Sequence, residues 1–203
     1  MEGAMVWAHI TAGSIALGAM FIAWFSRKGS QWHRLGGKVY VLSMAAALLL
    51  ATVVAALTHN LFLGLIGLFT AYLLFTGWRI ARARNGQQNT LDRLAASAMM
   101  FVAVGMAING IHMLLSGNNL GFVLLVFGFL GGVPALLDWR RNGWPVGRER
   151  IVLHLNRMGG ASIATVTAVF VVNIQTNPEF IAWLAPSVAI SPFIAWHTRQ
   201  QRV

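Results

Sequence analysis

Six histidines are the residues of this sequence best suited to chemistry. An imidazole can bind a metal, ligate haem iron or carry a proton near neutral pH. The chain has no cysteine, which excludes disulfides, Cys-ligated zinc and iron–sulfur clusters. It also lacks a phosphate-binding loop, an HExxH motif, a Ser-His-Asp spacing and paired carboxylates within the apolar segments. We therefore name no catalytic residue, and whether the chain is an enzyme stays open.

The histidines are spread over seven long apolar segments, and each segment predicts a transmembrane helix. Of the 203 residues, 57% are hydrophobic and 10% are charged, whereas a soluble domain carries about 25% charged residues. A segment of about 20 apolar residues crosses the roughly 30 Å of bilayer hydrocarbon. The predicted helices are Ala4–Phe25, Val39–Leu57, Leu61–Trp78, Leu94–Leu115, Leu120–Leu137, Met158–Ile174 and Phe180–Trp196. The predicted fold is all-α, with residues 1–203 forming a single domain, an integral membrane bundle of seven helices.

The basic residues predict which side of the membrane each connection faces. All 15 Lys and Arg residues lie between helices 1 and 2, between helices 3 and 4, between helices 5 and 6, or after helix 7. By the positive-inside rule these segments are cytoplasmic, which puts the N-terminus outside and the C-terminus in the cytoplasm. The net charge of +10 therefore indicates contact with the lipid bilayer and its anionic headgroups, and not with nucleic acid.

This topology divides the histidines into two layers: His9, His59 and His112 on the outer side, and His33, His154 and His197 on the inner side. His9 and His112 lie at similar depth, about 6–8 Å below the outer boundary at roughly 1.5 Å per residue. Two imidazoles at equal depth could bind a b-type haem between helices. Alternatively, each makes only an interhelical hydrogen bond. With His59 added, the three could form a metal site.

A second polar cluster is predicted at the inner ends of the helices. His33 and Arg34 precede helix 2, Asp138 ends helix 5, and His154 and Arg157 open helix 6. An acid at this depth needs a partner, which Arg157, Arg34 or His154 could supply. One interpretation is a cytoplasm-facing pocket for an anionic group, such as a haem propionate, a quinone oxygen or a lipid phosphate. The other is a structural salt-bridge cluster that joins helices 2, 5 and 6.

Several of these residues occur in a pattern seen in a known family. The pattern begins with His9, Ala-Gly-Ser at 12–14 and Arg-Lys-Gly at 27–29. It continues with Trp-His-Arg-Leu-Gly at 32–36 and Lys-Val-Tyr at 38–40. It ends with Asp138 and His-Leu-Asn-Arg-Met at 154–158. It resembles the bacterial DUF2306 family of membrane proteins over nearly the whole chain. The resemblance implies a multi-pass protein of the bacterial inner (cytoplasmic) membrane and brings no activity, substrate or cofactor. His59, His112 and His197 lie outside the pattern, which favours the inner cluster.

Three functions are compatible with these residues. The first is a redox-associated protein that binds b-type haem or quinone through membrane histidines. The second is a small-solute carrier or channel that uses helix 7, kinked at its prolines, and the polar residues Ser162, Thr165 and Asn173 of helix 6. The third is an accessory or assembly subunit of a membrane complex, or a homo-oligomer.

Overall fold

The computed structural model describes residues 2–202, which form seven α-helices and no strand. Each helix is long and apolar enough to cross a membrane, which confirms the predicted all-helical class and the number of candidate spans. The helices are α1 (Glu2–Phe25), α2 (Gln31–Leu57), α3 (Leu61–Arg82), α4 (Thr90–Leu115), α5 (Gly121–Arg140), α6 (Gly147–Asn173) and α7 (Phe180–Arg202). The chain divides into two compact units, residues 1–67 and 68–203. Each unit is described by itself, and the single-domain organisation stays a prediction.

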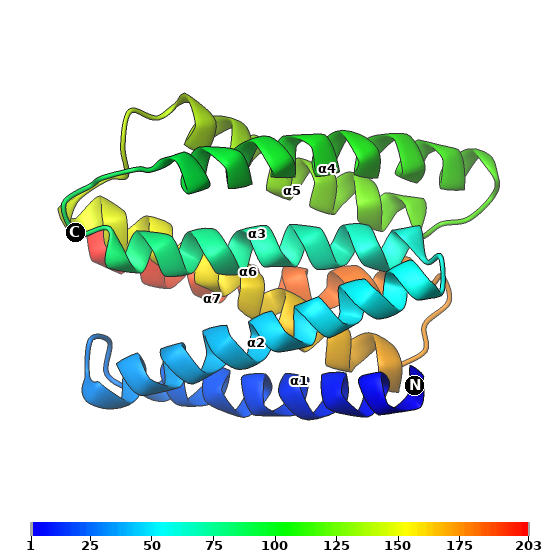
Figure 1. Cartoon of the computed structure of the whole chain (residues 1–203), viewed down its shortest axis with the longest axis horizontal. Helices are drawn as coiled ribbons and strands as arrows, with labels where there is room; N and C mark the ends of the chain where they lie inside the picture. Colours follow the sequence, from blue (N-terminus) through cyan, green and yellow to red (C-terminus); the bar gives the residue numbers. More distant parts are fainter. Residues whose placement is uncertain (1, 203) are drawn as a thin grey trace. The chain divides into compact units, whose positions relative to one another are not determined.

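The first unit is built on a helical hairpin in which α1 and α2 run antiparallel, side by side (Figure 1). Ala16 and Met20 of α1 are buried, as expected for a stripe of small and flexible side chains in a helix contact. Gly36 of α2 allows the closest approach of the two helices. A Cβ added there would lie 3.0 Å from the Ala23 nitrogen and 3.1 Å from the Ala19 oxygen. Both atoms belong to the backbone of α1, so they could not move aside.

In the second unit, α4 packs antiparallel to α5, and α6 packs against α7 (Figure 1). Gly128 and Gly132 form a GxxxG motif on α5. A Cβ added at Gly132 would lie 2.9 Å from the Cβ of Ala103, and one added at Gly128 would lie 3.2 Å from the Cβ of Met106. Both contacts are on α4, so this motif serves helix packing within the chain.

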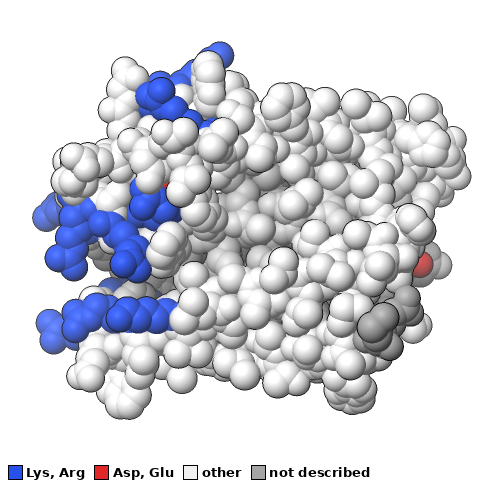
Figure 2. Space-filling model, in the orientation of Figure 1, with Lys and Arg blue, Asp and Glu red and all other residues white. Residues whose placement is uncertain are grey.

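Lys and Arg side chains gather at one end of each unit, which we call the basic end (Figure 2). In the first unit it is where α1 ends and α2 begins. In the second unit it is where α3 and α5 end and where α4 and α6 begin. The alternation of basic and non-basic connections along the sequence is therefore an alternation of helix ends within each unit.

Apart from α1, which ends at the predicted Phe25, the helices extend further at their basic ends than the apolar segments predict. α2 begins at Gln31, eight residues before the predicted Val39, and α6 begins at Gly147, eleven residues before the predicted Met158. As a correction, His33 and Arg34 lie in the first turn of α2 and do not precede it, while His154 and Arg157 lie inside α6 and do not open it. The reason is that an apolar segment ends at the membrane boundary, whereas helical hydrogen bonds continue into water.

Basic side chains also cap the helices that end here. Lys28 Nζ donates to the carbonyl oxygens of Ala23 (3.2 Å) and Trp24 (2.8 Å) in the last turn of α1. Burial lowers the pKa of Lys28 below its usual value. Arg150 Nη1 donates to the Ala81 oxygen (2.9 Å) in the last turn of α3. Cations at helix C-termini bind carbonyl groups that have no partner within the helix and interact favourably with the helix dipole.

Candidate functional site

Asp138, near the end of α5, is the centre of a buried polar cluster in the second unit. Its side chain is fully buried. Its Oδ2 atom accepts a hydrogen bond from the Tyr72 hydroxyl at 2.5 Å and another from Arg157 Nη2 at 2.7 Å. The three side chains come from α3, α5 and α6. The carboxylate therefore joins three helices through charge-assisted hydrogen bonds.

Two further contacts fix the position of the Arg157 guanidinium. Only 6% of its side chain is exposed, and its guanidinium carbon lies 5.5 Å from the centre of the Tyr72 ring. Its Nη2 atom is also 3.4 Å from the carbonyl oxygen of Pro134. A buried guanidinium without an anionic partner would be very costly, so the Asp138 pair is what makes this position of Arg157 stable.

The second oxygen of Asp138 is bonded differently. Its Oδ1 atom lies 3.8 Å from Arg141 Nε, which is an ion pair but too long for a hydrogen bond. Gln88, in the connection between α3 and α4, donates from Nε2 to the backbone oxygen of Asp138 at 2.8 Å. Asp138 Oδ1 and Gln88 Oε1 are both buried without a hydrogen-bond partner.

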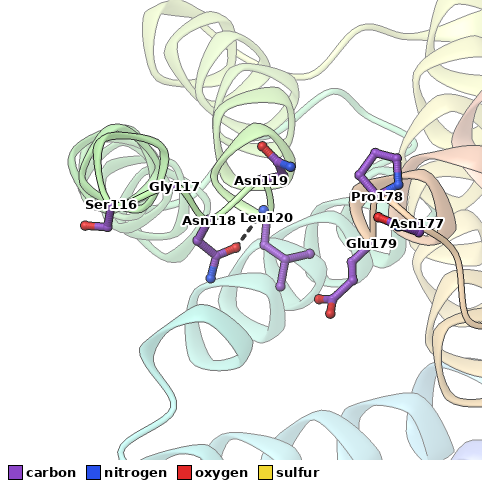
Figure 3. A pocket seen from close by; sticks show the side chains of 8 residues that line it. All are labelled: Ser116, Gly117, Asn118, Asn119, Leu120, Asn177, Pro178 and Glu179. Carbon is purple, nitrogen blue, oxygen red and sulfur yellow. Dashed lines mark hydrogen bonds between the residues drawn. The ribbon is translucent and has the colours of Figure 1, made fainter.

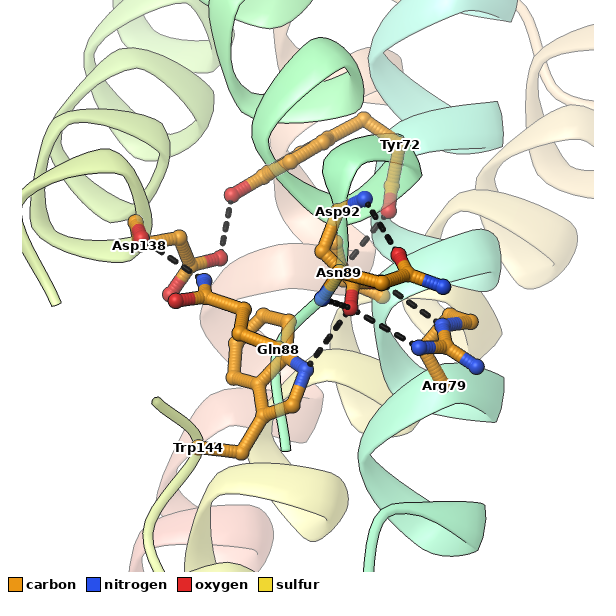
Figure 4. A network of polar contacts seen from close by, with 8 residues as sticks. Tyr72, Arg79, Gln88, Asn89, Asp92, Asp138 and Trp144 are labelled. Carbon is orange, nitrogen blue, oxygen red and sulfur yellow. Dashed lines mark hydrogen bonds and ion pairs between the residues drawn. The ribbon is translucent and has the colours of Figure 1, made fainter. Parts of the chain in front are cut away.

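Asp92, near the start of α4, is the centre of a second buried cluster (Figure 4). The Arg79 guanidinium of α3 binds the Asp92 carboxylate in a bidentate manner, with Nε donating to Oδ1 at 2.7 Å and Nη2 donating to Oδ2 at 2.9 Å. Trp144 Nε1 donates to Oδ2 at 3.2 Å. Asn89 and Asp92 also form a capping box, in which each side chain accepts the other's backbone N–H. Both oxygens of this carboxylate therefore have hydrogen-bond partners.

Three histidines place their Nδ1 atom against a backbone carbonyl of a neighbouring helix. The acceptors are Ala47 O for His9 (2.8 Å), Ala23 O for His33 (2.9 Å) and Gly77 O for His154 (2.9 Å). A carbonyl oxygen can only accept, so Nδ1 carries the hydrogen in each case. In the neutral imidazole the lone pair is then on Nε2. This bond is also the usual second interaction of a histidine that ligates a metal through its other nitrogen.

No protein-family model, no curated protein and no solved structure matches this chain. Its own residues are therefore the basis for a functional proposal.

The structure brings together part of the predicted inner cluster. Of the three partners predicted for Asp138, Arg157 binds it, whereas His154 bonds to Gly77. Arg34 belongs to the first unit, where its Nη1 donates to the Gly29 oxygen at 2.8 Å. Within the second unit the salt-bridge cluster joins α3, α5 and α6, and the part that the sequence interpretation gave to helix 2, in the first unit, stays a prediction.

Sequence reasoning missed Tyr72, Gln88 and Arg141 at this centre. A signal existed for Tyr72, because a tyrosine in the middle of an apolar helix carries a hydroxyl that needs a partner. No comparable signal existed for Gln88, which reaches Asp138 from a connection whose conformation the sequence does not reveal.

The predicted outer site combines residues of both units. His9 and His59 belong to the first unit and His112 to the second, so the haem pair and the metal triad stay predictions. Within either unit taken alone, residues 2–202 contain no group of three His, Asp or Glu side chains that could bind a metal. His59 and His112 are exposed and His9 is half-buried.

The second unit has a polar hollow at each end. The hollow opposite the basic end has a volume of about 400 Å³ and lies between the α4–α5 and α6–α7 connections (Figure 3). Its lining runs from Ser116 to Leu120 and from Asn177 to Glu179. The hollow at the basic end has a volume of about 390 Å³. Its lining is polar apart from one alanine and consists of Arg79, Arg82, Ala83, Asn85, Gln87, Gln88 and Asn89.

Proposed function

We propose that this chain is a redox-associated membrane protein that binds a b-type haem through histidine Nε2 atoms. The supporting observation is the interhelical Nδ1–H bond of His9, one of the two predicted haem ligands; His33 and His154 make the same kind of bond on the inner side. The bond fixes both the tautomer and the ring orientation, so that Nε2 is the atom that can ligate iron. A histidine that makes this interhelical hydrogen bond through Nδ1 can therefore also ligate iron through Nε2, so the two interpretations given for these histidines are compatible.

His9 is the histidine of the first unit that would hold the iron, and His112 of the second unit stays the other ligand that the sequence predicts. The inner cluster is less suited to an anionic group, because Arg157 and Arg79 are already paired with Asp138 and Asp92. Each pair neutralises the positive charge that would attract a haem propionate, a quinone oxygen or a lipid phosphate. The outer histidines therefore remain the better candidates, and the haem form of the redox hypothesis is favoured over the quinone form.

The proposed setting is the bacterial inner membrane, with the basic ends in the cytoplasm and the N-terminus outside. It is supported by the distribution of Lys and Arg along the chain and by the resemblance to the DUF2306 family. In this setting the basic ends contact anionic lipid headgroups. Reporter tags fused to the two ends of the chain test the topology. We expect the tags in opposite compartments, and tags in the same compartment would contradict it.

Absorption spectroscopy of the detergent-purified protein, with haem added, tests haem binding. We expect a Soret band shifted from that of free haem, and loss of the shift in His9→Ala and His112→Ala. His197→Ala is the matched control, because its Nδ1 bonds to Phe193 of its own helix at 3.1 Å. A protein that stays colourless, or a spectrum that both outer variants leave unchanged, would contradict the proposal.

The carrier hypothesis gains no support from α6. The three polar side chains named for this hypothesis each donate to the carbonyl oxygen four residues earlier: Ser162 to Met158, Thr165 to Ala161 and Asn173 to Val169. Such bonds satisfy these groups within the helix. An accessory role in a membrane complex remains the alternative if haem does not bind.

A further inference from the structure

The unpaired polar atoms of the described residues concentrate around Asp138. Five buried side-chain nitrogen or oxygen atoms have no hydrogen-bond partner. Four of them belong to Asp138 or to a residue bonded to it: Asp138 Oδ1, Gln88 Oε1, Arg141 Nε and Arg157 Nε. Buried polar atoms are nearly always hydrogen-bonded, to protein or to ordered water. A group of four at one carboxylate therefore indicates a bound polar ligand.

The four atoms include both hydrogen-bond donors and acceptors, which defines the kind of ligand that they can bind. Asp138 Oδ1 and Gln88 Oε1 accept hydrogen bonds, whereas the Nε atoms of Arg141 and Arg157 donate them. Gln88 is fixed in this orientation, because its Nε2 must donate to the Asp138 backbone oxygen. A ligand here must offer both donors and acceptors, as water does. The 3.8 Å from Arg141 Nε to Asp138 Oδ1 is a separation that a bridging water can span.

Two residues of this centre, Gln88 and Arg141, also reach the surface at the basic end of the second unit. Gln88 lines the hollow of about 390 Å³, and its amide also contacts Asp138. The Arg141 side chain is 36% exposed, so the second donor lies between the surface and the carboxylate. The two residues therefore connect a solvent-accessible surface to a fully buried acid.

We propose that Asp138 is a buried water-binding site, filled from the basic end past Gln88 and Arg141. The bound water donates to Asp138 Oδ1 and accepts from Arg141 Nε, and Gln88 Oε1 accepts from water on the way in. Through this water the buried carboxylate is linked by hydrogen bonds to the aqueous phase, which a dry salt bridge would not allow. The proposal is independent of haem binding, since it involves none of the histidines.

Radiolytic labelling of the intact protein in detergent tests this site. Hydroxyl radicals formed from an ordered internal water oxidise aromatic side chains next to it, even when these are buried. Tyr72 is 5% exposed and Tyr40 is 2% exposed, and they are the two tyrosines of the chain. We expect Tyr72 to be oxidised several-fold faster than its exposed area alone would give.

Matched variants test whether the oxidation of Tyr72 comes from bound water or from exposure of its ring to bulk solvent. Gln88→Leu removes Oε1 together with the Nε2 donor to the Asp138 backbone oxygen, and Arg141→Met removes Nε with the rest of the guanidinium. Each should lower the oxidation of Tyr72 several-fold. Gln87→Leu is the control, because Gln87 lines the same hollow and its side chain is exposed. It should leave the rate unchanged.

Two results would overturn the proposal. One is oxidation of Tyr72 in the unmodified protein at no more than the rate that its 5% exposure predicts. The other is a fast rate that Arg141→Met and Gln88→Leu leave unchanged. The first result needs no variant, so it decides the matter even if a variant fails to fold.

Discussion

Asp92 and Asp138 are two buried acids with similar surroundings. Each is fully buried in the second unit, near the basic end of its helix, and each is paired with an arginine from another helix. They differ in how completely the carboxylate is bonded. Asp92 binds through both oxygens, to Arg79, Trp144 and its own capping box. Asp138 places both of its side-chain hydrogen bonds on Oδ2 and leaves Oδ1 with an ion pair at 3.8 Å.

The difference separates a structural clamp from a site that can bind a ligand. A carboxylate whose two oxygens are both bonded to protein has little capacity left for a ligand. A buried carboxylate with an unbonded oxygen destabilises the fold unless a ligand or water hydrogen-bonds to that oxygen. Both acids have the buried charge that marks functional candidates in membranes. Hydrogen-bond satisfaction of the carboxylate oxygens distinguishes them, and it singles out Asp138.

The largest effect is expected from removing each acid. Asp138→Ala leaves Arg157 buried without a counter-charge, which should lower the free energy of unfolding by about 3–5 kcal/mol. Asp92→Ala should cost less, because the Arg79 side chain is 21% exposed and can turn to water. Reversible unfolding in mixtures of SDS and mild detergent measures both values. An Asp92→Ala cost equal to or above that of Asp138→Ala would contradict the ranking.

A smaller effect is expected from removing one neutral donor at each centre. Trp144→Phe deletes the N–H donated to Asp92 and should cost about 1–2 kcal/mol. Tyr72→Phe deletes the O–H donated to Asp138 and should cost less, because water at that centre can replace it. Trp139→Phe, at a Trp that is 51% exposed, controls for the smaller ring. A larger cost for Tyr72→Phe than for Trp144→Phe would indicate that the Asp138 centre is dry.

The smallest effect is expected at the helix cap next to Asp92. Asn89→Ala removes the cap of α4 and should cost about 1 kcal/mol. Ser30→Ala is the matched control in the first unit, where the Ser30 side chain accepts from His33 N at 3.2 Å without a reciprocal bond. Asn89→Ala combined with Asp92→Ala should cost less than the sum of the two, since the capping box links them. Additive costs would show that the two residues act independently.

The helix ends away from the basic residues could be predicted from the sequence, and those at the basic end, apart from the end of α1 at Phe25, could not. Leu57, Leu61, Leu115 and Phe180 are the predicted and the observed limits of α2, α3, α4 and α7. At these ends the helix stops where the chain turns back at the membrane boundary, so hydrophobicity and helicity end together. At the basic end the signal is a cap such as Ser30 or Asn89, which lies several residues beyond the apolar segment.

The candidate site was predictable only in part, for a similar reason. Arg157 could be named as one of three candidate partners of Asp138, because the chain has five acids and a charge at membrane depth needs a partner. Trp144 could not be assigned to Asp92, because its position depends on how two connections meet. Its backbone N–H donates to Gly86 O at 2.8 Å, and Gly86 and Gly143 both have positive φ angles. Contacts of this kind follow from tertiary structure and leave no pattern in the sequence.

A density map that resolves ordered water tests the contrast between the two acids most directly. We predict a water peak within hydrogen-bonding distance of both Asp138 Oδ1 and Arg141 Nε, and none in contact with the Asp92 carboxylate. A direct hydrogen bond between Arg141 and Asp138 Oδ1, with no water beside it, would contradict the account.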